Sequence, residues 1–429
     1  MRVLHEIRPQ LDPPDVRHHG LSEVVATLVG SEILRIAAEV RTLRESGRAV
    51  CDLTVGDFAP RQFRIPEPLR EGIVRALAAG QTHYPPSDGI GDLRRAVQVF
   101  YQRALGLDYP LEGILIAGGA RPIIWGTYAA VVEPGDRVVY PVPSWNNNHY
   151  AHLARAEGIA VPTRPENGFL PTAEEIAPAL RGARLLALNS PLNPAGTGFG
   201  RAQLEALARL VVEENRRRGP SERPLFLLYD QIYWLLASDH APHSTPVELV
   251  PEVAPYTVLV DGISKAFAAT GLRVGWTVGP PYLVARMRDL LGHVGAWAPR
   301  PEQHATAEIL ARPELTAELA GAVRGAVLAR LDALHDGLDR LHRDGLPVEV
   351  LPVGGGLYLS VRFDLVSRLG SNDAIRKYLL EEAGFAIVPF QAFGLADESG
   401  WFRVSVGAVG LDDIAAALPR LRAALAKLR

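Results

Sequence analysis

The chain is poor in cysteine and methionine, with one Cys51 and two methionines among its 429 residues. A single cysteine excludes an internal disulfide framework and a zinc site built on several cysteines, and it fits a reducing compartment. The first twenty residues lack the apolar core of a signal peptide, and no stretch is long and apolar enough to span a bilayer. We therefore expect a soluble cytoplasmic protein.

Lysine is also scarce compared with arginine. Of the 45 Lys and Arg residues, only Lys265, Lys377 and Lys427 are lysines. The last two lie in helix-like segments near the C-terminus, where a solvated charge explains them. Lys265 follows an apolar run and stands among small residues. An arginine keeps its proton at useful pH, whereas a buried lysine can become a neutral amine and condense with an aldehyde. A lysine at a strand end is more often structural than catalytic, so its neighbours must decide.

Bulk composition is that of an ordinary globular protein. Hydrophobic residues make up 48% of the chain and charged residues 22%, and the formal net charge is −3. This balance favours neither a nucleic-acid nor a membrane partner. A chain of this length is long for one hydrophobic core, so two closely associated lobes are expected.

The middle of the chain alternates short apolar runs with helical patterns. The runs are ILIA at 114–117, RVVYP at 137–141, RLLALNSP at 184–191, LFLLYD at 225–230 and TVLVDG at 257–262. They are continuously apolar, as is typical of strands that are buried on both faces of a parallel sheet. The pattern predicts an α/β domain with a mostly parallel central sheet and helices on both faces.

The two ends of the chain carry a different pattern. An amphipathic helix is predicted over 21–43, and a short strand over 49–55. After about residue 304, long helical patterns give way to short strands, which is typical of an α+β lobe. Neither end makes a core alone. We therefore predict a small α+β domain from residues 1–60 and 305–429, beside a large α/β domain from residues 61–304.

Polar motifs follow five of the predicted strands directly, at 118–121, 143–145, 189–193, 230–233 and 264–265. Open α/β sheets bind their ligands beyond the carboxyl ends of the strands. Five such motifs at one edge are harder to explain as ordinary turns than one would be. The functional site is therefore expected at this edge of the sheet.

Together these motifs resemble the class I/II aminotransferases, pyridoxal 5′-phosphate (PLP) enzymes of fold type I that are similar to aspartate aminotransferase. The resemblance runs over about 53–406, and the motifs keep the family's order: NPAG at 193–196, DQIY at 230–233 and SK at 264–265, followed by Arg273. It implies PLP as cofactor and the transfer of an amino group from an L-amino acid to a 2-oxo acid.

The resemblance implies three catalytic residues. Lys265 would form a Schiff base with the cofactor and later carry protons. Asp230 would pair with the pyridine nitrogen, and Tyr233 would donate to the 3′ oxygen of the ring. The other residues implied to hold the cofactor are Gly119, Ala120, Arg121, Trp145, Asn193, Ser264 and Arg273.

The chemistry of these residue types suits their implied roles. Small residues at 119–120 allow backbone N–H groups to approach a phosphate at a helix N-terminus, and Arg273 can bind it through a charge-assisted fork. The indole of Trp145 would stack on the cofactor ring. A core tryptophan and an Asn-Pro turn at Asn193 are also common without any ligand, so these two positions depend on the resemblance.

Substrate and subunit contacts are implied in the same way. Arg403 matches an arginine that clamps the substrate α-carboxylate, with Gly56 and Asn193 beside it. Tyr84 matches a tyrosine that reaches the cofactor phosphate of the neighbouring subunit. The resemblance thus implies a homodimer with composite sites, and no metal.

The chain departs from the family at two positions. Gln231 stands where the family usually has Glu, and Phe390 stands where it usually has Gly, so that Phe390 is expected to narrow the substrate entrance or reshape a loop. An arginine that faces the distal end of the substrate would select a second carboxylate, as in aspartate or glutamate. Candidates for reading the substrate side chain are Arg121, Arg300, Trp297 and residues 146–148.

Two other readings stay open at this point. The same cofactor and fold support β-elimination, decarboxylation and aldol cleavage, so a PLP-dependent lyase, decarboxylase or aldolase is the alternative enzyme. A transcriptional regulator with an aminotransferase-like body would carry an added DNA-binding domain, and only about twenty residues with no helix-turn-helix pattern precede the first predicted helix.

Overall fold

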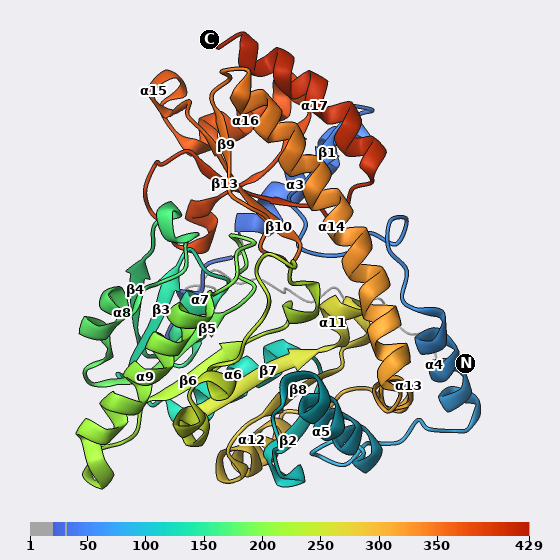
Figure 1. The fold of residues 1–429 in the computed structure, drawn as a ribbon, viewed down its shortest axis with the longest axis vertical. Coiled ribbons are helices and arrows are strands. Elements are labelled where there is room, and N and C mark those ends of the chain that lie inside the picture. Colours follow the sequence, from blue (N-terminus) through green and yellow to red (C-terminus); the bar gives the residue numbers. More distant parts are fainter. Residues whose placement is uncertain (1–19, 31, 429) are drawn as a thin grey trace, which may run out of the picture.

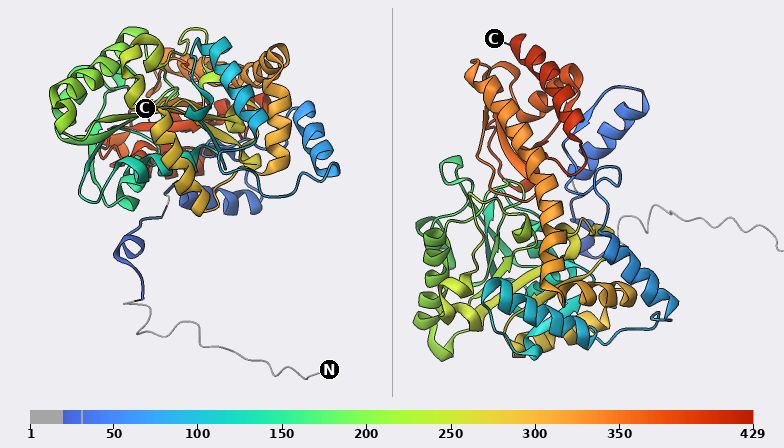
Figure 2. Two further views of the ribbon diagram at one scale, coloured as in Figure 1. Left: turned by 90° about the horizontal axis from the view of Figure 1, so that it is seen from below. Right: turned by 45° about the vertical axis from the view of Figure 1, so that its right-hand side comes forward.

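The computed structural model describes residues 20–30 and 32–428, which form two lobes (Figure 1). The larger lobe is built on a seven-stranded sheet and the smaller on a four-stranded sheet. The long helix α14 (Pro313–Arg343) runs from the larger lobe into the smaller one (Figures 1 and 2). The smaller lobe also contains the C-terminal helix α17 (Leu411–Ala426).

The large sheet has the strand order β2-β8-β7-β6-β5-β3-β4. Its strands are β2 (Ile114–Ala117), β3 (Arg137–Val142), β4 (Glu157–Pro162), β5 (Ala183–Asn189), β6 (Phe226–Asp230), β7 (Thr257–Gly262) and β8 (Gly275–Val278). All five strands expected from apolar runs are present. The sequence patterns missed β4, whose side chains are largely exposed, and β8, which runs antiparallel to both of its neighbours. The sheet is therefore mostly parallel, as predicted.

Alternate residues of the strands enter two separate cores. Ile116, Leu227 and Leu259 belong to a core that includes helices α5 (Gly91–Leu105), α9 (Arg201–Arg218) and α13 (Arg300–Leu310). Leu228 and Val258 belong to a second core with helices α6 (Ala120–Val131) and α12 (Pro281–His293). Successive strand residues point to opposite faces, so both faces of the sheet are covered.

The remaining elements of the large lobe are short or peripheral. They are α4 (Glu67–Ala78), η1 (Leu111–Gly113), α7 (Asn147–Leu153), η2 (Pro165–Asn167), α8 (Ala173–Leu180), η3 (Gly219–Ser221), η4 (Trp234–Leu236), α10 (Pro246–Leu249), η5 (Pro251–Tyr256), α11 (Ile263–Ala266) and η6 (Thr270–Leu272). The four-residue helix α11 carries Lys265 directly after β7.

The small lobe packs helices on an antiparallel sheet of order β12-β13-β10-β9. The strands are β9 (Val348–Val350), β10 (Tyr358–Phe363), β12 (Val388–Pro389) and β13 (Trp401–Ser405), and β1 (Cys51–Asp52) pairs separately with β11 (Phe385–Ala386). Helices α15 (Val366–Leu369) and α16 (Asn372–Ala383), and the turn η7 (Phe390–Phe393), complete the lobe. Its core joins Leu53, Leu331, Phe402 and Leu421.

The helix predicted over 21–43 is not continuous. The chain forms α2 (Glu23–Ala26) and α3 (Glu32–Glu45), with a break at 27–30, where Thr27, Val29 and Gly30 have low helix propensity. The side chain of Thr27 turns back to donate to the carbonyl of Glu23 at 2.7 Å. The prediction of one helix was therefore wrong in this respect.

Helix α3 contacts the C-terminal part of the chain. Val40 packs with Leu380 of α16, and the buried Arg376 of α16 forms an ion pair with Glu39 at 3.0 Å. Ile36 of the same helix belongs to the core of the large lobe. The domain boundaries at 60/61 and 304/305 stay a prediction. No helix within the described residues is long and apolar enough to cross a membrane.

Candidate functional site

A cavity of about 550 Å³ lies where the carboxyl ends of the parallel strands face the small lobe. It contains all of the residues expected to bind cofactor or substrate or to act in catalysis except Gly119 and Tyr84. Its lining includes Gly56, Ala120, Arg121, Trp145, Asn193, Asp230, Tyr233, Ser264, Lys265, Arg273 and Arg403. Strand ends of one parallel sheet share an edge, which is why positions so far apart in the sequence meet here.

The amine of Lys265 points into this cavity. Its Nζ donates to the carbonyl of Gly56 at 2.8 Å and lies 5.6 Å from the centre of the Tyr233 ring. Burial lowers the pKa of Lys265 to about 8. The positive charges of three nearby arginines lower this pKa further, and the carboxylate of Asp57 raises it. A useful fraction of this amine is therefore neutral near physiological pH, as a nucleophile or proton acceptor requires.

Asp230 ends β6 beside the lysine. One carboxylate oxygen accepts the backbone N–H of Ile232 at 3.1 Å. Burial raises the pKa of Asp230 to about 6, against the N–H group and the charge of Lys265, so the carboxyl is mainly ionised at neutral pH. Three residues on, the hydroxyls of Tyr233 and Tyr358 share a hydrogen bond of 2.8 Å.

Arg403 enters the cavity from the small lobe, on β13. It is 1% exposed, and it donates to Asn193 Oδ1 at 3.2 Å and to the carbonyl of Thr54. Its guanidinium carbon lies 4.8 Å from the ring centres of Tyr358 and Phe393. The Nε of Arg403 is buried and has no hydrogen-bond partner among the described residues, so one donor of this guanidinium is unsatisfied.

A second cationic cluster lies at the N-terminus of α6. Gly119 has a φ of +93°, which an L side chain rarely adopts, and a Cβ there would collide with the guanidinium of Arg273. Ala120, Arg121 and Ser264 line the cavity nearby. Burial and repulsion by Arg121 lower the pKa of Arg273, which donates to the carbonyl of Thr270 at 2.6 Å. The guanidinium carbon of Arg121 lies 5.4 Å from the Trp145 ring centre.

Other predicted positions lie outside the cavity. Tyr84 is 81% exposed, and its ring contacts the edge of Trp297 at 5.2 Å between centres. Arg300 donates to Gln81 Oε1 at 2.9 Å and to the carbonyl of Tyr84. Phe390 is fully buried against Phe169 at the start of η7. Phe390 is thus not among the residues that line the cavity, and the chain turns into η7 at this point.

Sequence reasoning missed several lining residues. Asp57 and Thr270 lie at the rim, where the Thr270 hydroxyl donates to Asp57 Oδ1 at 2.6 Å. Their adjacency to Gly56 and to the loop between Lys265 and Arg273 was a usable signal. Tyr358, and Ile33 and Ala37 from α3, carry no local motif, because only the packing of the lobes brings them here.

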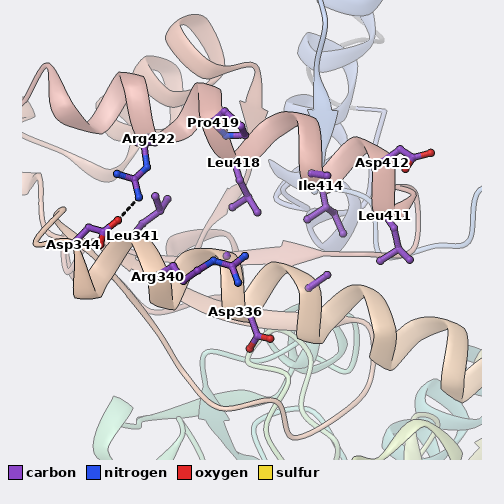
Figure 3. Close-up of a pocket in the computed structure, with 13 residues that line it drawn as sticks. Asp336, Arg340, Leu341, Asp344, Leu411, Asp412, Ile414, Leu418, Pro419 and Arg422 are labelled. Carbon is purple, nitrogen blue, oxygen red and sulfur yellow. Dashed lines mark hydrogen bonds and ion pairs between the residues drawn. The ribbon is translucent and has the colours of Figure 1, made fainter.

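A larger cavity, of about 720 Å³, lies between α14 and α17 in the small lobe. Figure 3 shows Leu341 of α14 and Ile414 and Leu418 of α17 along its apolar lining, with an ion pair between Arg422 and Asp344 at one end. This groove contains no lysine and none of the strand-end motifs. Size alone therefore does not identify the functional site.

The site has the donors that a phosphorylated pyridine aldehyde requires. The guanidinium of Arg273, beside the N-terminus of α6, suits a phosphate dianion. Lys265 supplies an amine that is partly neutral, and Asp230 supplies a carboxylate for a protonated ring nitrogen. The residues present thus fit PLP.

The comparisons with known proteins agree. The family model "Aminotransferase class I and II" matches residues 48–421. A probable aspartate/prephenate aminotransferase of Thermus aquaticus is 32% identical over 382 residues, covering 87% of this chain and 93% of its own. An aspartate aminotransferase of Rhizobium meliloti strain 1021 is 30% identical over 413 residues, which is 94% of this chain and 96% of its own.

Solved structures give the same result. An aspartate aminotransferase of Thermus thermophilus, solved with maleate, superposes with a TM-score of 0.85 at 29% identity, covering 95% of this chain and all of that one. The chain therefore belongs to the class I and II aminotransferases, and it is a PLP-dependent transaminase of fold type I.

Proposed function

We propose that this transaminase takes dicarboxylic amino acids, aspartate or glutamate, as amino donors. The carrying observation is that two arginines from different lobes line one cavity, Arg403 from β13 and Arg121 from α6. A guanidinium binds a carboxylate through two parallel hydrogen bonds, so the pair matches a substrate with two carboxylates. Named relatives act on aspartate, and one was solved with the dicarboxylate maleate, which supports this class.

We assign the α-carboxylate to Arg403. Its Asn193 and Thr54 contacts hold the guanidinium in place, and its unpartnered Nε leaves a donor for the substrate. A fixed, buried donor lowers the entropic cost of orienting the substrate. Gly56 lies beside it, so its backbone can contact the same carboxylate.

We assign the cofactor to the opposite set of residues. PLP, when bound, accepts the electron pair that remains on the α-carbon of the amino acid. Gly119, Ala120, Ser264 and Arg273 would hold its phosphate, and Trp145 its ring face. The Asp230 carboxylate would keep the ring nitrogen protonated, and Tyr233 would donate to the ring oxygen.

Lys265 is the group that moves protons in this assignment. As a neutral amine it would accept the proton from the substrate α-carbon and, as an ammonium, would give it up again within the site. A water molecule would then release the oxo acid, while the amino group stays with the cofactor. The lyase, decarboxylase and aldolase alternatives are less favoured, because the relatives over nearly the whole chain are aminotransferases.

We also propose a homodimer in which Tyr84 reaches the neighbouring site. Tyr84 is 81% exposed and lies outside the cavity of its own chain, while Val74 and Leu77 of α4 present further exposed apolar side chains in the segment before it. Exposed apolar groups gathered in one segment are typical of an interface. A cytoplasmic location is part of the same proposal, and rests on composition alone.

The first test is a spectral titration of the PLP-loaded protein with single amino acids and no oxo acid. We expect aspartate and glutamate to convert the bound cofactor to its pyridoxamine form, because the protein carries out each half-reaction separately. Lys265→Ala should abolish the conversion. Release of ammonia, pyruvate or carbon dioxide instead would support a lyase or decarboxylase.

The second prediction concerns the lysine amine. In the cofactor-free protein, acetylation of Lys265 should rise with a midpoint near pH 8, since burial lowers its pKa to about that value. Peptide mass spectrometry resolves it from Lys427, a control whose pKa is raised by an ion pair with Glu382. Equal midpoints for the two lysines would contradict a buried, partly neutral amine.

The third prediction concerns substrate choice. Arg121→Ala at saturating cofactor should raise KM for aspartate about 10- to 100-fold, the usual worth of a hydrogen bond to a charged group. Alanine as donor should be affected much less. Arg286→Ala, on the exposed face of α12, is the matched control. If Arg300→Ala raises KM selectively for aspartate instead, the distal carboxylate is assigned to Arg300. If Arg121→Ala raises KM equally for aspartate and alanine, the proposal for Arg121 is wrong.

The fourth prediction tests the composite site. Sedimentation should give twice the chain mass of 46.5 kDa. Exchange of subunits between inactive Tyr84→Ala and inactive Lys265→Ala proteins should restore activity, because each mixed dimer keeps one intact site. A monomer would contradict the dimer, and a mixed dimer without activity would contradict the role of Tyr84.

A further inference from the structure

A second buried carboxylate, Asp261, lies behind the site and outside the cavity lining. It is the penultimate residue of β7 and is 2% exposed. Its Oδ1 accepts the backbone N–H of Gly262 at 2.7 Å, and its Oδ2 accepts Trp234 Nε1–H at 2.8 Å and the hydroxyl of Tyr101 at 3.2 Å. Three donors on one buried carboxylate form a built hydrogen-bond site.

The orientation of the donors around Tyr101 is determined. Its hydroxyl oxygen accepts the side-chain N–H of Gln231 at 3.2 Å and the indole N–H of Trp276 at 3.3 Å. The hydroxyl proton is therefore left for Asp261. At the far end, the carbonyl oxygen of Gln231 lies 3.4 Å from His243 Nε2, and burial lowers the pKa of His243 to about 3, so the neutral ring can donate. His243 thus donates to Gln231, Gln231 donates to Tyr101, and Tyr101 donates to Asp261, which accepts at the end of this chain of hydrogen bonds.

The two oxygens of Asp261 hold two different segments of the site. Oδ1 holds Gly262, which caps helix α11 and thereby fixes the start of the segment with Lys265. Oδ2 holds Trp234, which opens η4 directly after Tyr233. We propose that Asp261 is a positioning residue, and that it sets the lysine segment against the segment with Asp230 and Tyr233.

The charge of Asp261 also bears on the site. Burial raises its pKa to about 7, the three donors oppose this rise, and the nearby Asp230 adds to it. The titratable groups that face it are Asp230 on β6 and Tyr101 on α5, with neutral His243 beyond Gln231. A negative charge here would help keep cations in the cavity protonated. Below about pH 7 this negative charge is lost as the carboxyl binds a proton.

Gln231 offers a reciprocal test, because it lies on the other side of the same Tyr101 hydroxyl. Asp261→Asn removes the negative charge and replaces one accepting oxygen with an NH2 group, so that one of the three donors loses its acceptor. Gln231→Glu adds a second carboxylate, and the double variant moves the single carboxylate across Tyr101. Thr277→Val is the matched control. It removes a buried hydrogen bond to the carbonyl of Leu259 on β7, and that bond does not connect the Lys265 segment with the Tyr233 segment.

We expect Asp261→Asn to lower kcat for the aspartate half-reaction by about tenfold or more, with much less change in KM, since ground-state binding at Arg403 is untouched. The pH midpoint of the visible absorbance of the bound cofactor should fall, because a nearby negative charge is gone. The double variant should recover part of both effects. Thr277→Val should change neither.

The inference rests on the proposed assignment of the site. The pH midpoint of the cofactor absorbance distinguishes a failure of the proposed function from a failure of the proposal for Asp261. A wild-type protein that binds PLP but does not transaminate would refute the function, while the midpoint shift would still test Asp261. A folded Asp261→Asn protein with unchanged kcat and midpoint would overturn the proposal, as would the same losses in Thr277→Val. If Asp261→Asn does not fold, Trp234→Phe removes the donor to Oδ2 and keeps an aromatic ring at this position. An unchanged kcat in that variant would overturn the proposal equally.

Discussion

The common direction of β5, β6 and β7 is the constraint on which the site depends. Because these neighbouring strands run parallel, Asn193, Asp230 and Lys265 lie at or just after strand ends at one edge of the sheet, although they are far apart along the chain. Strong burial on both faces holds this register. The small lobe adds Arg403 from β13, so the cavity lies between the edge of the large sheet and the small lobe.

The site concentrates charge that burial disfavours. Lys265, Arg273 and Arg403 all have lowered pKa values with burial as the main cause, whereas burial raises the pKa of Asp230. Each shift moves a group toward its neutral form. An anionic ligand at the arginines would relieve part of this cost, so the cluster favours anions.

Local chemistry decided how much could be predicted. The strands with continuous apolar runs and the motifs at their ends were recognisable, because each depends on a few adjacent residues. The exposed strand β4 and the antiparallel β8 were not, since neighbours in space decide them. The same holds for Tyr358 and for the network of Asp261 and Tyr101, which joins α5, η4, β7 and β8, elements that no sequence pattern connects. The break at 27–30 was missed although Thr27, Val29 and Gly30 carried a local signal for it.

The scarcity of lysine has a consequence for carbonyl chemistry in general. Besides Lys265, the described chain presents the amines of Lys377 and Lys427, and both are engaged in ion pairs, with Asp373 at 2.7 Å and Glu382 at 2.5 Å. Arginine covers the rest of the surface with groups that do not condense with simple aldehydes in the same way. The protein can thus handle a reactive aldehyde with few side-chain amines exposed to glycation, the unwanted attachment of sugars and other carbonyl compounds.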